Sequence, residues 1–219
     1  MSKIPLRVSC AGLVKIEIQG KLLGIINKKR LAAGVTIYTP PGGSYHYQGR
    51  ATRHYLQDAL VLTFEEGRDL RFSLPGDPDQ RLQILDSFNS WFKSGQGRET
   101  VPSRELYEEL IGEEGVLSLE QNSFPKLSHL SEKQKHVRLR EASSRPGHIG
   151  VITEYFFELF QAHLTKHSRK ALLQGLKQRY PMVRLLALDE ILMEKTKDSL
   201  QIKDHEGPVP IASSFFYFL

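Results

Sequence analysis

Cysteine and long apolar runs are nearly absent from this chain of 219 residues. Its single cysteine, Cys10, excludes an internal disulfide and any zinc site built from several cysteines. No apolar run approaches the roughly 20 residues that a membrane-spanning helix needs. The first five residues contain no apolar core, so they make a poor secretory signal. We therefore expect a cytoplasmic protein that does not span a membrane.

Internal repeats and low-complexity segments are also absent, and the charge imbalance is small. The net charge of +5 and the pI near 9.2 favour anionic partners in a general way. The chain carries no recognisable nucleic-acid-binding motif, however, so a nucleic acid is the least favoured of these partners. The composition is that of an ordinary globular protein, and no strong boundary interrupts it. We expect a single domain over residues 1–219.

The hydrophobic periodicity predicts a mixture of strands and helices. The predicted strands cover residues 8–18, 22–27, 35–38, 60–64, 70–74, 151–159 and 183–188. One predicted helix begins after Asp77. Two others cover residues 104–110 and 165–179, and a further helical turn covers 189–192. Residues 45–75 as a whole read as β-rich. This alternation indicates a mixed α/β or α+β fold.

Two of these segments should contribute to the core. In the helix after Asp77, this aspartate is a plausible N-cap and Pro78 suits the first helical position. An amphipathic stripe follows, formed by Leu82, Leu85, Phe88, Trp91 and Phe92. At the other end of the chain, the aromatic segment 215–219 should be docked, because a free one would expose a sticky surface.

The most distinctive stretch is the acidic helix at residues 104–110. It places Glu105, Glu108 and Glu109 at positions i, i+3 and i+4, which share one helix face. Three like charges on one face repel each other unless a cation or basic side chains compensate them. Mg²⁺ prefers oxygen ligands of this kind, often together with substrate phosphates. The face is therefore either a metal-holding surface or an ordinary solvated acidic one.

Other stretches have the chemistry to meet phosphate, and each also has a plain structural interpretation. Residues 28–30, which include Lys28 and Arg30, form a basic cluster that is either a solvated loop or a phosphate contact. The turn at residues 40–43 contains Gly42 and Gly43, where backbone N–H groups can approach a ligand closely. Residues 133–145 are the most basic region, which either covers a ligand or forms a solvated surface. A strand carries Glu154 and Glu158 on one face, which is either exposed or supplies a catalytic base. The Glu113–Glu114 pair is a further candidate for this base.

Three of these features occur in an order that resembles the Nudix hydrolase family. A hairpin starts at residues 11–14, a strand runs into Pro41-Gly42-Gly43, and the stretch Arg104-Glu105-Leu106-Tyr107-Glu108-Glu109 follows. That last stretch matches the arginine, the hydrophobic position and the three glutamates in the second half of the Nudix box. Residues 183–191 resemble the strand and turn that close many Nudix domains. The basic middle region and the long spacing resemble Nudix domains linked to bacterial nucleotide-signalling defence systems.

The resemblance implies an α/β/α sandwich around a mixed sheet, with an inserted hairpin and helix at about 45–99. It also implies hydrolysis of a nucleoside diphosphate linked to another moiety, with Mg²⁺ or Mn²⁺ as the cofactor. By position, Glu105, Glu108 and Glu109 would bind metal and activate water, and Arg104 would orient them. Gly42 and Gly43 would shape the loop that closes on the substrate.

The chain departs from the family pattern in its spacing and in two positions. Gly43 and Arg104 are 61 residues apart, much further than in the usual box, so an insertion separates its two halves. Gln96 stands where the box has an upstream glutamate, and Ile111 stands where it has a glycine. Two functions stay open on these grounds. One is a metal-dependent hydrolase, and the other is a catalytically silent module that binds a nucleotide or a partner protein. The insertion and the apolar tail could also serve a homodimer.

Overall fold

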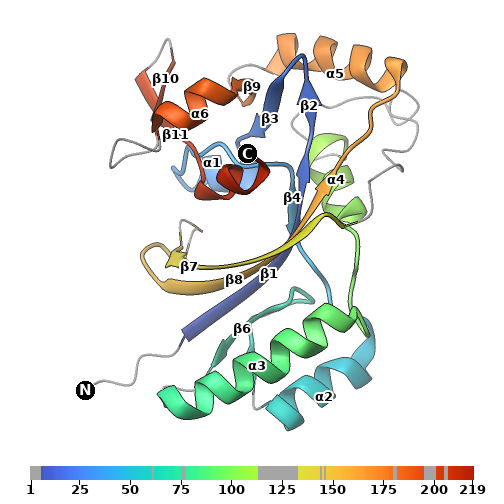
Figure 1. Ribbon diagram of the computed structural model, residues 1–219, viewed down its shortest axis with the longest axis vertical. Helices are drawn as coiled ribbons and strands as arrows, with labels where there is room; N and C mark the ends of the chain where they lie inside the picture. Colours follow the sequence, from blue (N-terminus) through green and yellow to red (C-terminus); the bar gives the residue numbers. More distant parts are fainter. Residues whose placement is uncertain are drawn as a thin grey trace. The chain divides into compact units, whose positions relative to one another are not determined.

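The structure is a computed structural model that describes residues 6–60, 62–74, 77–112, 133–143, 145, 147–179, 182–194, 201–204 and 207–219 (Figure 1). Its contacts divide the chain into two compact units. Unit 1 comprises Met1–Gly12, Ser44–Pro102 and His136–Phe157. Unit 2 comprises Leu13–Gly43, Ser103–Lys135 and Glu158–Leu219. Within the described residues, no helix is both long and apolar enough to cross a membrane.

The largest sheet has six strands. They are β1 (Leu6–Lys15), β4 (Gly42–Ser44), β5 (Thr63–Phe64), β6 (Arg71–Leu74), β7 (Lys135–Ala142) and β8 (Ile152–Gln161). The strand order is β5-β6-β1-β8-β7, and β4 pairs with β1. The predicted hairpin at 60–74 is present as the antiparallel pair of β5 and β6, in which Phe64 is opposite Phe72. Both β1 and β8 begin in unit 1 and end in unit 2.

Two helices of unit 1, α2 (Gly49–Leu60) and α3 (Pro78–Ser94), lie side by side (Figure 1). The predicted start of α3 is confirmed, because the Asp77 side chain accepts hydrogen bonds from the backbone N–H groups of residues 79 and 80. Phe88 of this helix is fully buried, and its ring centroid lies 4.8 Å from Phe72 and 5.3 Å from Phe156. Edge-to-face pairs of this kind add to the stabilisation that burial gives.

Unit 2 contains a three-stranded antiparallel sheet with the order β2-β3-β9. Its strands are β2 (Glu17–Ile18), β3 (Lys21–Ile25) and β9 (Val183–Ala187). Its described residues include the helices α1 (Lys28–Ala32), α4 (Ser103–Leu110), α5 (Lys166–Arg179) and α6 (Leu188–Glu194). A two-stranded sheet of β10 (Gln201–Asp204) and β11 (Gly207–Pro210) precedes a terminal 3-10 helix, η2 (Ser213–Phe218).

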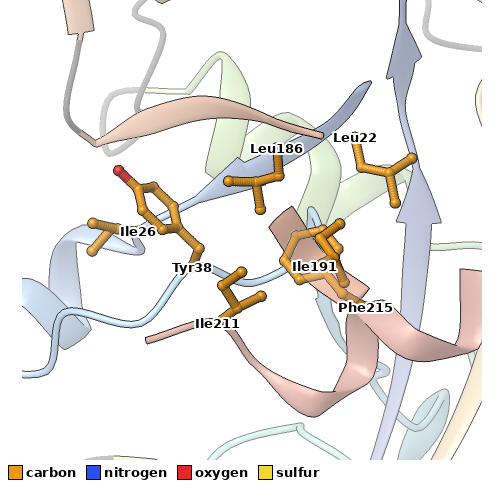
Figure 2. Packing of buried hydrophobic residues seen from close by; sticks show 7 residues of the cluster. All are labelled: Leu22, Ile26, Tyr38, Leu186, Ile191, Ile211 and Phe215. Carbon is orange, nitrogen blue, oxygen red and sulfur yellow. The ribbon is translucent and has the colours of Figure 1, made fainter. Parts of the chain in front are cut away.

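The aromatic tail packs into the core of unit 2, as predicted. Phe215 is buried in a cluster that also receives side chains from β3, β9 and α6, and Figure 2 shows these side chains turned toward one another. The cluster consists of Leu22, Ile26, Tyr38, Leu186, Ile191, Ile211 and Phe215. Phe216 and Phe218 pack against it while staying partly exposed. The tail is therefore part of the fold.

The mixed α/β class is confirmed, and several local predictions are wrong. The segment read as β-rich contains α2, whose buried residues Leu56 and Leu60 are four apart, so helical periodicity decides its structure. The strand predicted at 35–38 forms only isolated bridges at Tyr38 and Thr39. In α3, Leu82 is 58% exposed and does not join the apolar stripe. The prediction of a single domain with an insertion at about 45–99 stays a prediction.

Candidate functional site

The acidic helix α4 is fixed in unit 2 by its apolar side. Leu106 and Leu110, four residues apart, are both buried. The helix begins directly after Pro102 and ends at Leu110. Beyond that end, the backbone N–H of Gly112 donates to the carbonyl of Tyr107 over 2.8 Å. This anchoring leaves the opposite face of the helix, with its three glutamates, for polar contacts.

Glu109 receives a hydrogen bond on each carboxylate oxygen. The backbone N–H of Gly42 donates to Oε2 over 2.8 Å, and Nδ2 of Asn27 donates to Oε1 over 3.1 Å. The loop that supplies this N–H is itself held, because the N–H of Val14 donates to the carbonyl of Pro41 over 2.8 Å. The fold thus brings together the glycine turn and the acidic helix, although 67 residues separate Gly42 from Glu109.

The neighbouring glycine is in close contact with a second glutamate. A Cβ atom placed on Gly43 would lie 2.3 Å from Oε2 of Glu105 and 2.5 Å from its Cδ. Any side chain at this position would therefore displace the Glu105 carboxylate. Both glycines of the turn therefore lie against α4. Gly42 donates its N–H to Glu109, and Gly43, which has no side chain, leaves room for the carboxylate of Glu105.

Arg104 compensates part of the negative charge on this face. Its Nη1 donates to Oε1 of Glu105 over 3.0 Å and to both oxygens of Glu108 over 3.2 Å. Glu108 is the most open of the three glutamates, with 54% of its side chain exposed. One guanidinium thus binds two carboxylates, and the orienting role that the resemblance implies for Arg104 stays a prediction.

The donor chemistry of this face suits a divalent cation. Three carboxylates supply the hard oxygen ligands that such a cation prefers, and Arg104 offsets part of their charge. The described part of the chain nevertheless contains no group of three His, Cys, Asp or Glu side chains arranged to hold a metal ion as it stands. The carboxylates point to Arg104, Asn27 and Gly42, so cation binding requires them to turn toward a common point.

Asn27 is the site residue that sequence reasoning missed. Its side chain binds Glu109 from 82 residues away, and no local motif marks it. The basic cluster that follows it is helix α1, not a loop. Lys28 is half-buried at the start of this helix, next to the asparagine that binds Glu109. The side chain of Arg30 lies outside the described residues.

The glutamates of strand β8 are buried, so the interpretation of an exposed strand face is wrong. Glu154 is bound by Arg138 and by Nε of Arg140, the latter over 2.5 Å. Glu158 is fully buried and receives a salt bridge of 3.1 Å from Lys133. Part of the basic region at 133–145 therefore neutralises buried carboxylates, through Lys133, Arg138 and Arg140. The Glu113–Glu114 pair lies outside the described residues.

Unit 1 contains a second charged cluster, centred on Glu65, which the sequence did not indicate. Nε of Arg7 lies 2.6 Å from Oε1 of Glu65, and Nη1 of Arg145 lies 3.3 Å from Oε2. Nε2 of His148 lies 3.6 Å from the same carboxylate. Burial raises the pKa of Glu65, but the hydrogen bond from Arg7 and the surrounding positive charges outweigh it and lower the pKa below its ordinary value. Burial, with repulsion from Arg7, lowers the pKa of His148.

The chain matches a known protein family. A family model described as the SMODS-associated NUDIX domain matches residues 5–206, which is nearly the whole chain. No curated protein and no solved structure matched the chain. The six-stranded sheet with its flanking helices is consistent with a Nudix fold.

Proposed function

Because the chain belongs to the SMODS-associated NUDIX domain family, a Nudix domain linked to a nucleotide-signalling defence system, we propose that it hydrolyses a nucleoside diphosphate linked to another moiety. The site would be the acidic face of α4 together with the turn at Gly42 and Gly43. We call this combination the glycine–glutamate site. A nucleotide-type ligand is what a Nudix domain suggests, and its phosphates need cations or N–H donors.

One observation supports this proposal above the others. Gly42 donates its N–H to Glu109, and Gly43 leaves the space that the Glu105 carboxylate fills. The two halves of the split motif are thus in contact in unit 2. A solvated acidic helix has no need of this arrangement, since water compensates exposed carboxylates without help from a loop 67 residues away.

Mg²⁺ or Mn²⁺ is the cofactor we propose, with Glu105, Glu108 and Glu109 as the residues that would hold it. A divalent cation bound there supplies Lewis acidity, which offsets phosphate charge and makes water a better nucleophile near neutral pH. Arg104 orients Glu105 and Glu108, and Asn27 and Gly42 orient Glu109. Lys28 and Arg30 are the proposed phosphate contacts. The buried ion pairs of Glu154 and Glu158 make both of them poor candidates for the catalytic base.

A second candidate function rests on a different observation. The carboxylates of α4 do not converge as they stand, and Gln96 occupies the position of the upstream glutamate. Both facts favour a domain that binds a nucleotide without cleaving it. Such a module would be stabilised by its ligand, since binding to the native state alone raises stability by RT ln(1 + [L]/Kd).

One experiment separates the two functions. Nucleoside diphosphate derivatives are incubated with the protein and with Mg²⁺ or Mn²⁺, and products are separated by chromatography while thermal stability is followed in parallel. A hydrolase releases product in a metal-dependent way. A silent module gives thermal stabilisation by the nucleotide and no product.

The variant Glu109→Gln tests whether this site is responsible. Substitution of groups that merely support a metal ligand costs 10–100-fold, so loss of a ligand itself should reduce turnover by more than about 100-fold. Glu66→Gln is the matched control, because Glu66 is an exposed glutamate of unit 1. Full activity in Glu109→Gln would refute the assignment of the glycine–glutamate site.

A further inference from the structure

One helix of this protein carries basic side chains and no acidic ones. Helix α5 has the sequence Lys-His-Ser-Arg-Lys-Ala-Leu-Leu-Gln-Gly-Leu-Lys-Gln-Arg, which contains five Lys or Arg residues and no Asp or Glu. With these five set aside, 25 of the 30 basic residues remain against 25 acidic ones. The whole net charge of +5 therefore equals the charge of this one helix.

Four of these cations share an exposed face, which we call the α5 basic face. Lys166, Arg169, Lys170 and Lys177 are all exposed and follow each other at helical spacing. They border an open hollow of about 330 Å³ that is lined by Lys166, Arg169, Lys170, Leu173, Gln174 and Lys177. The other side of the helix is buried through Ala171 and Leu172. The fold thus fixes which side of α5 the solvent meets.

Within the part of the chain that the structure describes, the cations of this face form no ion pairs. Among the described residues, none of the four takes part in a salt bridge, whereas Arg7, Arg138, Arg140 and Lys133 all bind buried or half-buried carboxylates. Unlike those residues, the α5 cations repel one another at positions i, i+3 and i+4, and no acidic side chain of the helix relieves this. A polyanionic partner would relieve it.

The geometry favours a nucleic acid over an anionic membrane surface. An interfacial helix inserts large apolar side chains into the lipid boundary. No residue of α5 is among the exposed large hydrophobic residues of the described chain. From Lys166 to Lys177 the helix rises about 16 Å, a length over which one strand of a duplex presents about five phosphates. Four cations over this length match such a backbone in the sign of their charge and in the length that they span.

We propose that the α5 basic face binds the phosphate backbone of a nucleic acid without reading its sequence. Lys166, Arg169, Lys170 and Lys177 contact phosphates, and Gln174 supplies a neutral hydrogen-bonding group among them. Contacts with phosphates alone carry no sequence information, and the face has no aromatic side chain on which bases could stack. This inference is independent of hydrolysis at the glycine–glutamate site. It also departs from the expectation that a nucleic acid is the least favoured partner.

The test is the salt dependence of binding to fluorescently labelled duplex DNA, single-stranded DNA and RNA, measured by anisotropy. If all four cations contact phosphates of a duplex, the slope of log K against log salt should be about −3.6. Affinity should then fall about 150-fold between 50 and 200 mM KCl. Anionic phospholipid vesicles form a separate arm of the experiment. Binding to vesicles without binding to any oligonucleotide would overturn the proposal.

Two quadruple variants of the full chain decide whether α5 is responsible. Replacing Lys166, Arg169, Lys170 and Lys177 by glutamine should abolish this binding and its salt slope, with little change in helix propensity. The control replaces four exposed cations elsewhere, Arg50, Arg68, Lys93 and Lys135, and removes the same charge. It should keep the affinity within about threefold and the slope within one unit of the parent values. Equal affinity in the α5 variant and the parent, equal losses in the two variants, or no binding by the parent would each overturn the proposal.

Discussion

Substitution of Gly43 by alanine probes the glycine–glutamate site through a single added carbon. The new Cβ would lie 2.3 Å from Oε2 of Glu105, whereas ordinary contacts begin near 3.4 Å. The carboxylate must therefore retreat by about 1 Å. A misplacement of about 1 Å at a catalytic centre can cost about 100-fold in rate. We expect kcat/KM for the hydrolysed nucleotide to fall by about that factor.

The stability of Gly43→Ala should change far less than its activity. The atoms that the new methyl group meets belong to the far end of a flexible side chain, and the backbone of Gly43 does not need positive φ. Replacing glycine by alanine at a compatible position stabilises by about 0.4–1 kcal/mol through the unfolded state. Weakening the partly exposed Arg104–Glu105 pair costs about 0–1 kcal/mol. The free energy of unfolding should therefore stay within about 1 kcal/mol of the parent value.

The assay combines steady-state kinetics with denaturant unfolding, and a double variant supplies the control. In a Glu105→Ala background the added methyl group meets no carboxylate, so Gly43→Ala should cause no further loss of turnover. Non-additivity of this kind identifies residues that act together. An active Gly43→Ala protein, or equal further losses in both backgrounds, would refute the reasoning.

The remaining predictions concern stability. Phe215→Ala should lower the free energy of unfolding by about 3–5 kcal/mol, measured by urea denaturation, while truncation of Leu219, which is 51% exposed, should change it by less than about 0.5 kcal/mol. Equal effects would show that the tail is not docked. Gly12→Ala should cost about 1–3 kcal/mol in the same assay, because its Cβ would lie 2.6 Å from the hydroxyl of the buried Tyr45; an unchanged midpoint would contradict this. The lowered pKa of Glu65 gives stability that is present above the ordinary carboxyl pKa and lost as pH falls through the lowered one. Glu65→Gln should remove this part of the acid sensitivity, so unfolding curves between pH 2 and 5 that keep the parent's pH dependence would contradict the assignment.

The sequence predicts well those elements whose signals are local. The N-cap at Asp77 followed by Pro78 marks the start of α3, and the basic amphipathic stretch marks α5. The strand at 8–18 is predicted from the alternation of Val14, Ile16 and Ile18 with Lys15 and Glu17, although β1 itself is buried over almost its whole length. The aromatic tail could be placed in the core for a simple physical reason, namely the cost of leaving it exposed.

Helix α2 shows where local signals are too weak. Its residues are mostly polar or basic, and only Leu56 and Leu60 provide a buried pair at helical spacing. The segments at 35–38, 60–64 and 70–74 read as strands, so the β-rich interpretation of 45–75 covers this helix as well. The helix packs against α3, and such a tertiary contact can override local propensity. A pattern within a few neighbouring residues does not contain this contact.

The candidate site depends on contacts that no local pattern contains. The motif at 104–109 identified the glutamates, but the partners of Glu109 lie 67 and 82 residues away. For the same reason the burial of Glu154 could not be foreseen, because its arginines lie on a different strand. The sequence can name the charged residues of a site, whereas only the fold determines which of them are compensated.

The most direct test of the central claim is the binding of Mn²⁺ to the glycine–glutamate site, followed by the loss of the free Mn²⁺ signal in electron paramagnetic resonance. The parent protein and the Glu66→Gln control should reduce the free signal to the same extent, and Glu109→Gln should leave most of it. A parent protein that binds no Mn²⁺, with or without a nucleoside diphosphate derivative, would contradict the claim that the acidic face of α4 is a cation site.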